Sequence, residues 1–518
     1  MSLFLTEHIL ELARSQPGKQ AVLYKNETLS YGELADRVKK CAAFLSALHI
    51  RKGERVLLTA LSRPETIVIY LGIQFIGAVT VFMDKNAAAE KMWQAYSDTE
   101  ASLCITDRTS EEYADRMRLC SLRELYRFCA EGSVESNILP GFVCRDKDSI
   151  EEMIFTTGTT GKPKGVMLSC RAVYQISKNT IEGIGLLTED RVLIPLPLNH
   201  SLALRELRGA LWQGATVVLQ NGSAFARETE KNITELECSG MVTVPASLEL
   251  MKNQMQERFG RVVGKLRYIE VGAGSLTVRQ RNVFTALLPE TKLINTWGSS
   301  ETGGALFADV SEVVKDPARC AAVGKPLSGI SVRIIDTDGN EIPHTDHDHY
   351  GRLALKGDMV MSGYYNLESE TKKALQDGWF VTNDIAYTDE NGYIYMLGRI
   401  DDIINVGGEK VSPVEVENLV EEFPAIRECA CIGVPDPKNT LGQIPVLFFV
   451  MGDGFSLDEL KKFLAAKKER FKLPQEYVPI PALPRNHMKK VDRKVMRSMW
   501  EQQVSSENKT DVADELFG

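Results

Sequence analysis

The sequence has no long block of lysine or arginine and no excess of basic residues. Its 518 residues include 61 Lys and Arg against 70 Asp and Glu, which gives a formal net charge of −9 at pH 7. Proteins that bind nucleic acids or anionic membrane surfaces concentrate positive charge, so no nucleic acid or membrane partner is expected. Any polyanionic ligand must therefore be held by a local site.

The sequence also shows no pattern of paired cysteines, of a signal peptide or of a membrane span. The ten cysteines are scattered without a CxxC pair, and 44% of residues are apolar, so we expect a large core and free thiols in a reducing cytoplasm. Residues 1–15 lack a basic stretch and carry Glu7 and Glu11, which predicts an amphipathic helix. The one membrane candidate, residues 67–83, is interrupted by two glycines and Gln74, and it predicts a helix, a turn and a strand.

The sequence does contain an alternation of short apolar runs and longer helical patterns. Up to about residue 321 this alternation predicts parallel sheets covered by helices. Shorter β-rich segments with Asp-Gly and Glu-Asn-Gly turns follow, and they predict a small barrel or twisted sheet. The expected fold is α/β, with a large N-terminal domain at 1–398 that includes a β-barrel-like part at 322–398. A small α+β domain at 399–503 and a polar, disordered tail at 504–518 complete it.

Residues 156–165 combine features that suit a polyphosphate. They read Thr-Thr-Gly-Thr-Thr-Gly-Lys-Pro-Lys-Gly and lie between two apolar runs that predict strands. Glycines let backbone N–H groups approach an anion, hydroxyls add donors, and lysines offset charge. A P-loop is excluded, because Gly158 and Gly161 are only three residues apart and Pro163 stands where a Mg²⁺-binding Ser or Thr is required.

This segment resembles the signature of the adenylate-forming superfamily, which includes acyl- and aryl-CoA synthetases, peptide-synthetase adenylation domains and luciferases. Four further segments resemble that family in the same order along the chain: 295–302 (Asn-Thr-Trp-Gly-Ser-Ser-Glu-Thr), 378–384 (Gly-Trp-Phe-Val-Thr-Asn-Asp), 398–411 and 483–494. The resemblance covers about residues 5–500 and is strongest to the acyl- and aryl-CoA synthetases. It implies that the C-terminal domain is mobile.

The resemblance also implies how the nucleotide is held. Glu301 would hold the Mg²⁺ that screens the phosphates, Trp297 would stack on adenine, and Asp384 would bind both ribose hydroxyls. Asn383 replaces the usual Gly before Asp384, and we expect it to tolerate the positive φ of a turn. The residues expected to bind ATP are Thr156, Thr157, Gly158, Thr159, Thr160, Gly161, Lys162, Lys164, Gly272, Ala273, Gly274, Asn295, Trp297, Gly298, Thr302, Asp384, Arg399 and Lys490.

Two half-reactions follow from the resemblance. The expected catalytic residues are Lys490, Glu301 and Thr157. Lys490 would bridge the substrate carboxylate and the α-phosphate, and no general base is needed because a carboxylic acid is ionised at pH 7. The C-terminal domain would then rotate about Asp401, withdraw Lys490, and present Gly407 and Gly408 as the lining of a tunnel for the pantetheine arm.

The acid-binding pocket is only partly specified. Its expected lining is His200, Ser201, Met241, Val244, Gly272 and Gly298. His200 stands where amino-acid-activating relatives have Asp, which disfavours an α-amino acid. Gly298 stands where acetate-specific relatives have a bulky Trp, so a larger acid is expected.

Two polar clusters have competing interpretations. Arg205 and Arg208 share one helix face, and they either recognise a second substrate carboxylate or form salt bridges at the surface beside Glu206. We favour the surface pair. Residues 344–349, His-Thr-Asp-His-Asp-His, have the composition of a metal site, but their place between two predicted strands favours a solvated loop.

The sequence thus predicts an ATP- and Mg²⁺-dependent enzyme that converts a small-molecule carboxylic acid to an acyl-AMP and then to a CoA thioester. The alternative is a stand-alone enzyme that loads the phosphopantetheine of a carrier protein in trans, because residues 490–494, Lys-Val-Asp-Arg-Lys, resemble peptide-synthetase domains. A non-catalytic nucleotide-binding relative is disfavoured, because Lys490 and Glu301 are both present.

Overall fold

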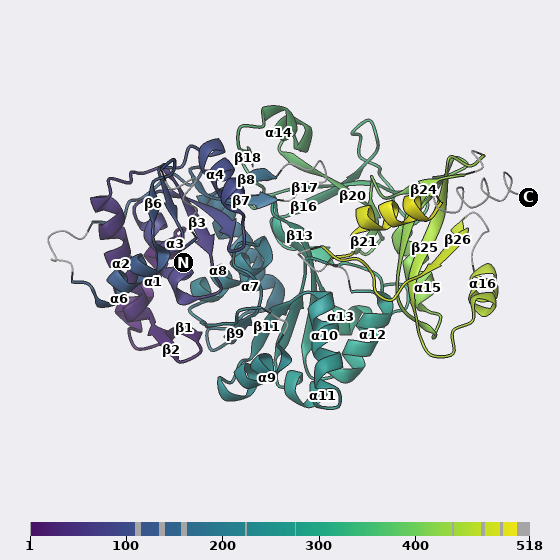
Figure 1. Ribbon diagram of the computed structural model, residues 1–518, viewed down its shortest axis with the longest axis horizontal. Coiled ribbons are helices and arrows are strands. Elements are labelled where there is room, and N and C mark those ends of the chain that lie inside the picture. Colours follow the sequence, from purple (N-terminus) through teal and green to yellow (C-terminus); the bar gives the residue numbers. More distant parts are fainter. Residues whose placement is uncertain are drawn as a thin grey trace, which may run out of the picture.

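The computed structural model describes residues 2–108, 115–133, 140–156, 163–222, 225–274, 276–437, 440–467, 472–486 and 490–504. A large N-terminal part is followed by a small C-terminal one, as the sequence predicts (Figure 1). Residues 505–518, which carry most of the expected disordered tail, lie outside the described residues.

The first large sheet has nine strands in the order β15-β14-β13-β12-β11-β9-β10-β1-β2. Neighbours from β13 to β1 pair in parallel, whereas β2, β14 and β15 add antiparallel edges. Its strands are β1 Gln20–Tyr24, β2 Glu27–Ser30, β9 Arg191–Ile194, β10 Thr216–Leu219, β11 Gly240–Thr243, β12 Tyr268–Val271, β13 Lys292–Ser299, β14 Gly303–Asp309 and β15 Lys325–Pro326. These include the expected strands of this half.

The second large sheet has seven strands in the order β18-β8-β7-β4-β3-β5-β6. β7 and β8 pair antiparallel, and they flank the segment expected to hold phosphate. The strands are β3 Arg55–Ala60, β4 Val79–Asp84, β5 Leu103–Ile105, β6 Leu119–Cys120, β7 Ile150–Thr156, β8 Lys164–Ser169 and β18 Gly363–Tyr364.

Helices cover both sheets, as the alternating pattern predicts. Ser30 caps α2 by accepting a hydrogen bond from the Glu33 backbone N–H, and the Glu33 side chain returns a bond to Ser30, a capping box. The helices of the N-terminal part are α1 Leu5–Ser15, α2 Tyr31–Ala47, α3 Pro64–Phe75, α4 Ala89–Asp98, α6 Leu122–Glu131, α7 Cys170–Ile184, α8 Ser201–Gln213, α9 Ala226–Glu235, α10 Pro245–Met255, α11 Arg258–Val263, α12 Val278–Leu287, α13 Val310–Val313 and α14 Glu368–Ala374.

The membrane candidate forms helix α3, a turn and strand β4, so this prediction is confirmed. Among the described residues, no helix combines the length and the apolar character needed to cross a membrane. The ten cysteines are free and eight of them are buried, which also agrees with the sequence.

The β-rich part is an open sheet. Its strands pair in the order β16-β17-β20-β19, and β21 pairs with β20. Within the described residues no pairing closes this sheet, so it is not a barrel. The strands are β16 Ser331–Ile335, β17 Gly351–Lys356, β19 Leu375–Gln376, β20 Trp379–Thr388 and β21 Ile394–Arg399.

The small C-terminal part has its own core. Strands β24 and β25 pair antiparallel, β26 adds in parallel, and β22 and β23 form a separate hairpin. Its elements are β22 Ile404–Val406, β23 Glu409–Val411, α15 Pro413–Glu421, β24 Ile426–Pro435, β25 Gln443–Met451, α16 Leu457–Ala465 and β26 Glu476–Pro479. Two apolar clusters built only from residues after Ile403 fill it, which supports an independent folding unit.

Helix α8 lies between the two large sheets (Figure 1). Every residue from Ala203 to Trp212 is buried, including three charged ones. Arg205 binds Glu270 of β12 in the nine-stranded sheet, at 2.5 Å. Arg208 binds Glu152 of β7 in the seven-stranded sheet. The interpretation of Arg205 and Arg208 as a surface pair is therefore wrong, because both partners come from distant strands that the sequence does not place beside α8.

The Arg208–Glu152 pair gives a test of this packing. Both side chains are 0% exposed, and Tyr70 donates a further hydrogen bond to Glu152 at 3.0 Å. Removing one partner leaves a buried charge unpaired, which costs about 3–5 kcal/mol. We expect Arg208→Met to lower the guanidinium unfolding midpoint markedly, and Arg208→Met combined with Glu152→Gln to recover part of the loss.

The matched control is Lys231→Met. Lys231 and Glu235 form an exposed ion pair at 3.7 Å on α9, and such a pair contributes about 0–1 kcal/mol. Equal midpoints for Arg208→Met and Lys231→Met would contradict the role of the buried pair.

Candidate active site

The expected phosphate segment is anchored by two paired strands. Thr156 at the end of β7 lies opposite Lys164 at the start of β8, and the Thr156 hydroxyl donates to the Lys164 carbonyl at 3.4 Å. Residues 157–162, which hold Thr157, Gly158, Thr159, Thr160, Gly161 and Lys162, lie outside the described residues.

Lys164 belongs to a chain of polar contacts that ends at Glu301. Its ammonium binds Glu370 of α14 at 2.7 Å and lies 4.9 Å from the centre of the Tyr364 ring. The Tyr364 hydroxyl donates to Glu301 at 2.9 Å. Burial raises the pKa of Tyr364, and the Glu301 charge acts in the same direction, so Tyr364 is a stable donor. Tyr364 is not among the site residues expected from the sequence; the Gly-Tyr-Tyr run at 363–365 is the local signal for it.

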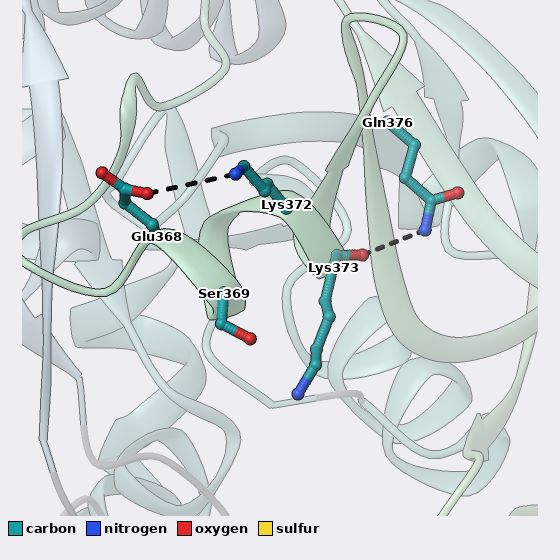
Figure 2. A pocket seen from close by; sticks show the side chains of 5 residues that line it. All are labelled: Glu368, Ser369, Lys372, Lys373 and Gln376. Atoms are coloured by element: carbon teal, nitrogen blue, oxygen red, sulfur yellow. Dashed lines mark hydrogen bonds and ion pairs between the residues drawn. The ribbon is translucent and has the colours of Figure 1, made fainter.

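A polar hollow beside α14 touches this chain of contacts only through Glu370, among the described residues. Figure 2 shows its side chains, Glu368, Ser369, Lys372, Lys373 and Gln376. Lys372 pairs with Glu368 at 4.0 Å, and Gln376 donates to the Lys373 carbonyl at 3.1 Å. These lysines are balanced by groups on their own helix, since Lys373 also pairs with Glu370 at 3.1 Å.

Three charged residues from the two parts of the chain meet beside Glu301. Asp384 on β20 lies opposite Arg399 on β21, with 4.0 Å between the carboxylate and the guanidinium Nε. The charge of Lys490, in the C-terminal part, also acts on the Asp384 carboxylate. Burial raises the pKa of Asp384, Arg399 and Lys490 oppose that rise, and Glu301 adds to it. Desolvation lowers the pKa of Lys490, Asp384 opposes this, and Arg399 adds to it.

The turn expected before Asp384 has a different form. Asn383 lies within β20 and does not take a positive φ, so the expectation of a positive φ at this residue is wrong. The strand instead accommodates the site by a register shift against β17 between Arg352 and Ala354. Such an irregularity re-aims side chains, here at Asp384.

The expected adenine side consists of two neighbouring segments. Ala273 has a φ of 61°, a left-handed conformation that costs a non-glycine residue about 1–2 kcal/mol. Strain of this kind concentrates at ligand sites. A Cβ on Gly272 would lie 3.6 Å from the Thr296 carbonyl, so the loop at 272–274 packs directly on β13. Gly274 is exposed at the end of this loop.

Residues of β13 are held tightly on this side. Trp297 is half-buried against the main core, whereas Asn295 is buried and donates only a long bond to the Val323 carbonyl, at 3.5 Å. Thr302 is buried in the turn after β13 and accepts from the Ser299 backbone N–H at 3.3 Å. A Cβ on Gly298 would lie 1.8 Å from the Gly303 carbonyl, so strand packing requires this glycine whatever the substrate.

The expected pocket residues divide between two faces of the nine-stranded sheet. His200 directly precedes α8 and Ser201 is the first residue of that helix, whose buried side chains share the main core with Val244. Met241 is buried in a separate core on the opposite face, with α9–α12. Its assignment to the pocket is therefore wrong, because side chains alternate along a strand and Met241 points away from α8.

The expected hinge and thiol tunnel are exposed in this structure. Asp401 lies at the surface directly after β21. Gly407 and Gly408 form the two-residue turn between β22 and β23 with φ values of 61° and 98°. Such a turn requires positive φ at both positions, which explains both glycines.

The histidine cluster at 344–349 forms part of a contact between the two parts of the chain. His344 and His349 are exposed, as expected for a solvated loop, but His347 contacts Glu415 of α15. A second contact lies on α12, where Arg279 donates to the Ile426 carbonyl at 2.5 Å. Among the described residues, no group of three or more His, Cys, Asp or Glu side chains is placed to hold a metal ion.

This geometry defines an adenylate-forming type of site. The charge of Lys490, in the small C-terminal part, acts on Asp384 of the large part, on which Glu301 also acts, and strands β7 and β8 flank a Thr- and Gly-rich segment. Family models agree with it: an AMP-binding enzyme model matches residues 10–365, and the C-terminal domain of AMP-binding enzymes matches residues 415–490. The chain belongs to the AMP-binding enzyme family, among the acyl- and aryl-CoA synthetases of the adenylate-forming superfamily.

Individual relatives match nearly the whole chain. The 2-succinylbenzoate–CoA ligase of Bacillus velezensis is 28% identical over 493 residues, which cover 94% of this chain and 96% of that one. The o-succinylbenzoate CoA synthetase (MenE) of Bacillus subtilis, solved with the acyl-adenylate OSB-AMP, is 25% identical with a TM-score of 0.80 over 93% and 96% of the two chains. ATP-bound MatB of Rhodopseudomonas palustris shares the fold, with a TM-score of 0.86, 23% identity, and coverage of 96% and 99%.

The shifted groups predict the pH profile of acid activation. Asp384 has a raised pKa, so its carboxylate is lost at a higher pH on the acid side than an ordinary aspartate. Lys490 has a lowered pKa, so its charge is lost at a lower pH on the alkaline side than an ordinary lysine. In ATP–pyrophosphate exchange we expect a bell-shaped dependence of kcat/KM on pH. Its acid limb should lie at a higher pH, and its alkaline limb at a lower pH, than ordinary Asp and Lys side chains would give.

Lys490→Arg separates the two limbs. A guanidinium stays protonated throughout this range, so the alkaline limb of kcat/KM should move to higher pH while the acid limb stays in place. An alkaline limb that does not move would exclude Lys490 as its source.

Proposed function

We propose that this enzyme activates an aromatic carboxylic acid of the o-succinylbenzoate type as an acyl-AMP and then transfers the acyl group to CoA. The observation that carries the proposal is the electrostatic influence between Lys490, from the small C-terminal part, and Asp384 of the large part, on which Glu301 also acts. The substrate carboxylate and the α-phosphate of ATP are both anionic and repel each other. The Lys490 ammonium would offset this repulsion where the two groups react.

In the first half-reaction the substrate carboxylate oxygen attacks the α-phosphorus, and pyrophosphate leaves in line. Lys490 offsets the charge of both reactants, and Asp384 with Arg399 orients the ribose. Lys164 and the residues of 156–162 neutralise the leaving phosphates. The reaction therefore depends on positioning and charge neutralisation, with no proton to remove from the ionised acid.

Magnesium fits the carboxylate of Glu301. Mg²⁺ is commonly held by one or two carboxylates together with substrate phosphates, so a full cage of protein ligands is not needed. Glu301 offers one half-buried carboxylate, and its Oε1 is fixed by Tyr364. The ion would add charge neutralisation at the phosphates.

In the second half-reaction a thiol attacks the acyl carbonyl, a thioester forms, AMP leaves, and the thiol proton is released. We propose that the domain after Arg399 rotates about Asp401 for this step. Rotation would remove Lys490 from the acyl-adenylate and bring the exposed hairpin turn at Gly407 and Gly408 towards it. The contacts of His347 and Arg279 with the C-terminal part would have to break.

The choice of acid rests on two points. Bacillus relatives named 2-succinylbenzoate–CoA ligase match over 93–95% of this chain. His200, at the N-terminus of α8, also replaces the Asp expected for an α-amino acid. Arg205 and Arg208 do not contribute to acid binding, since both are paired inside the fold.

Lys490→Ala tests the catalytic assignment. We expect ATP–pyrophosphate exchange to fall by about a hundredfold or more, while ATP binding measured by calorimetry stays within a few-fold of the parent. Thioester formation from presynthesised acyl-AMP should be retained, because Lys490 has no role in that step.

Lys462→Ala is the control, since Lys462 is exposed on α16 and distant in sequence from the site motifs. Lys490→Ala with unchanged exchange would overturn the assignment, and loss of both half-reactions would indicate a folding defect.

One set of assays tests both which carboxylic acid is activated and which thiol receives the acyl group. Pyrophosphate exchange with o-succinylbenzoate, anthranilate, an aliphatic acid and an α-amino acid should be fastest with o-succinylbenzoate. Thioester formation is then followed with free CoA and with a phosphopantetheinylated carrier protein. If the acyl group is transferred to the carrier protein and not to CoA, the carrier-loading alternative replaces CoA ligation. If pyrophosphate exchange occurs only with the α-amino acid, the proposed aromatic acid is wrong.

A further inference from the structure

A buried network of polar side chains joins α8 to β12 and β13. Arg205 donates to Glu270 Oε1 at 2.5 Å, and the Thr296 hydroxyl donates to the same oxygen at 2.6 Å. The other guanidinium nitrogen, Nη1, donates to the Thr180 hydroxyl of α7 at 3.1 Å. None of these four side chains is more than 4% exposed. The Arg205 guanidinium thus binds groups from two other elements, α7 and β12, and Glu270 links it to a third, β13.

A second buried carboxyl group, that of Glu206, acts on Glu270 in this network. Glu206, next to Arg205 on α8, accepts from the Tyr268 hydroxyl at 3.1 Å through Oε1. Among the described residues, the second oxygens of Glu206 and Glu270 have no hydrogen-bond partner by geometry, and the two carboxyl groups influence one another's protonation. Burial raises the pKa of Glu206 well above its usual range, and the charge and hydrogen bond of Glu270 add to this. A neutral Glu206 can donate to Glu270, which leaves Glu270 as the single anion opposite Arg205.

The three elements joined by Glu270 lead directly to the expected nucleotide and acid sites. Four residues before Arg205, α8 begins at Ser201 beside His200. Two residues after Glu270 lies the loop at 272–274, with its strained Ala273. Thr296 immediately precedes Trp297 in β13. The shared oxygen of Glu270 fixes the spacing of these segments.

We propose that Thr296, through Glu270 and Arg205, is a positioning residue that sets Trp297 and the loop at 272–274 at the spacing required to bind the adenine end of the nucleotide. The inference rests on the proposed function and on the expectation that Trp297 and the loop at 272–274 form the adenine side of its nucleotide site. The competing explanation is that the network only stabilises the fold. In that case, removing the Thr296 hydroxyl or the Thr180 hydroxyl should change nucleotide binding equally.

Thr180 provides the matched control. Its hydroxyl binds the same guanidinium and donates to the Ile176 carbonyl at 3.0 Å, and it is fully buried, but it lies on α7 and carries no segment of the expected adenine site. Thr296→Val and Thr180→Val each replace a hydroxyl by a methyl group of similar volume. Thr296→Ser keeps the hydroxyl and serves as the conservative variant.

AMP binding by calorimetry is the decisive measurement, because it does not depend on which acid is activated. We expect Thr296→Val to raise the Kd for AMP by about tenfold, the effect of losing one hydrogen bond to a charged group. Thr296→Ser and Thr180→Val should stay within about twofold of the parent. Thermal unfolding should drop similarly for Thr296→Val and Thr180→Val.

The outcomes separate the two levels of inference. If the parent enzyme does not bind AMP, the proposed function fails. If the parent binds AMP and the two valine variants weaken binding equally, or neither does, the positioning role is overturned. If Thr296→Val alone weakens AMP binding and Thr296→Ser restores it, the positioning role is supported.

Discussion

The large domain depends on charges buried in α8. Arg205 and Arg208 of this helix bind carboxylates of the two opposite sheets, so α8 fixes how the sheets face one another. Buried ion pairs add little net stability, because desolvation offsets most of their attraction, but a broken pair is costly. Such contacts therefore specify one arrangement rather than strengthen it. Because His200 begins α8, the same contacts also place the expected acid pocket.

A second constraint governs the relation between the two parts of the chain. Lys490 approaches Asp384 only because the small C-terminal part rests on the large one through contacts such as His347 with Glu415 and Arg279 with Ile426. Both of these contacts are polar, unlike the apolar cores on either side. A domain held in this way can change its orientation, as two successive reactions at one site would require.

Much of the architecture could be read from local patterns. The alternation of apolar runs and helical segments predicted the strands of both sheets, because each strand and its covering helix leave a periodic signal in adjacent residues. The capping box of Ser30 and Glu33 at the start of α2 is likewise local, since it spans four residues. The predictions for single residues were wrong where contacts with segments distant in sequence determine the conformation. Met241 faces the core opposite α8, and Asn383 continues a strand whose register shift lies against β17.

The sequence by itself determined the family, the order of the motifs, and the residue types that a polyphosphate and a ribose require, because these signals lie within short segments. Only the tertiary structure decided the partners of the buried charges. Arg205 and Glu270 are 65 residues apart, and Arg208 and Glu152 are 56 apart, distances over which no local rule connects two side chains. The contact of Tyr364 with Glu301 and the approach of Lys490 to Asp384 have the same origin. They exist because separate sheets and domains pack together, and that packing is a property of the whole chain.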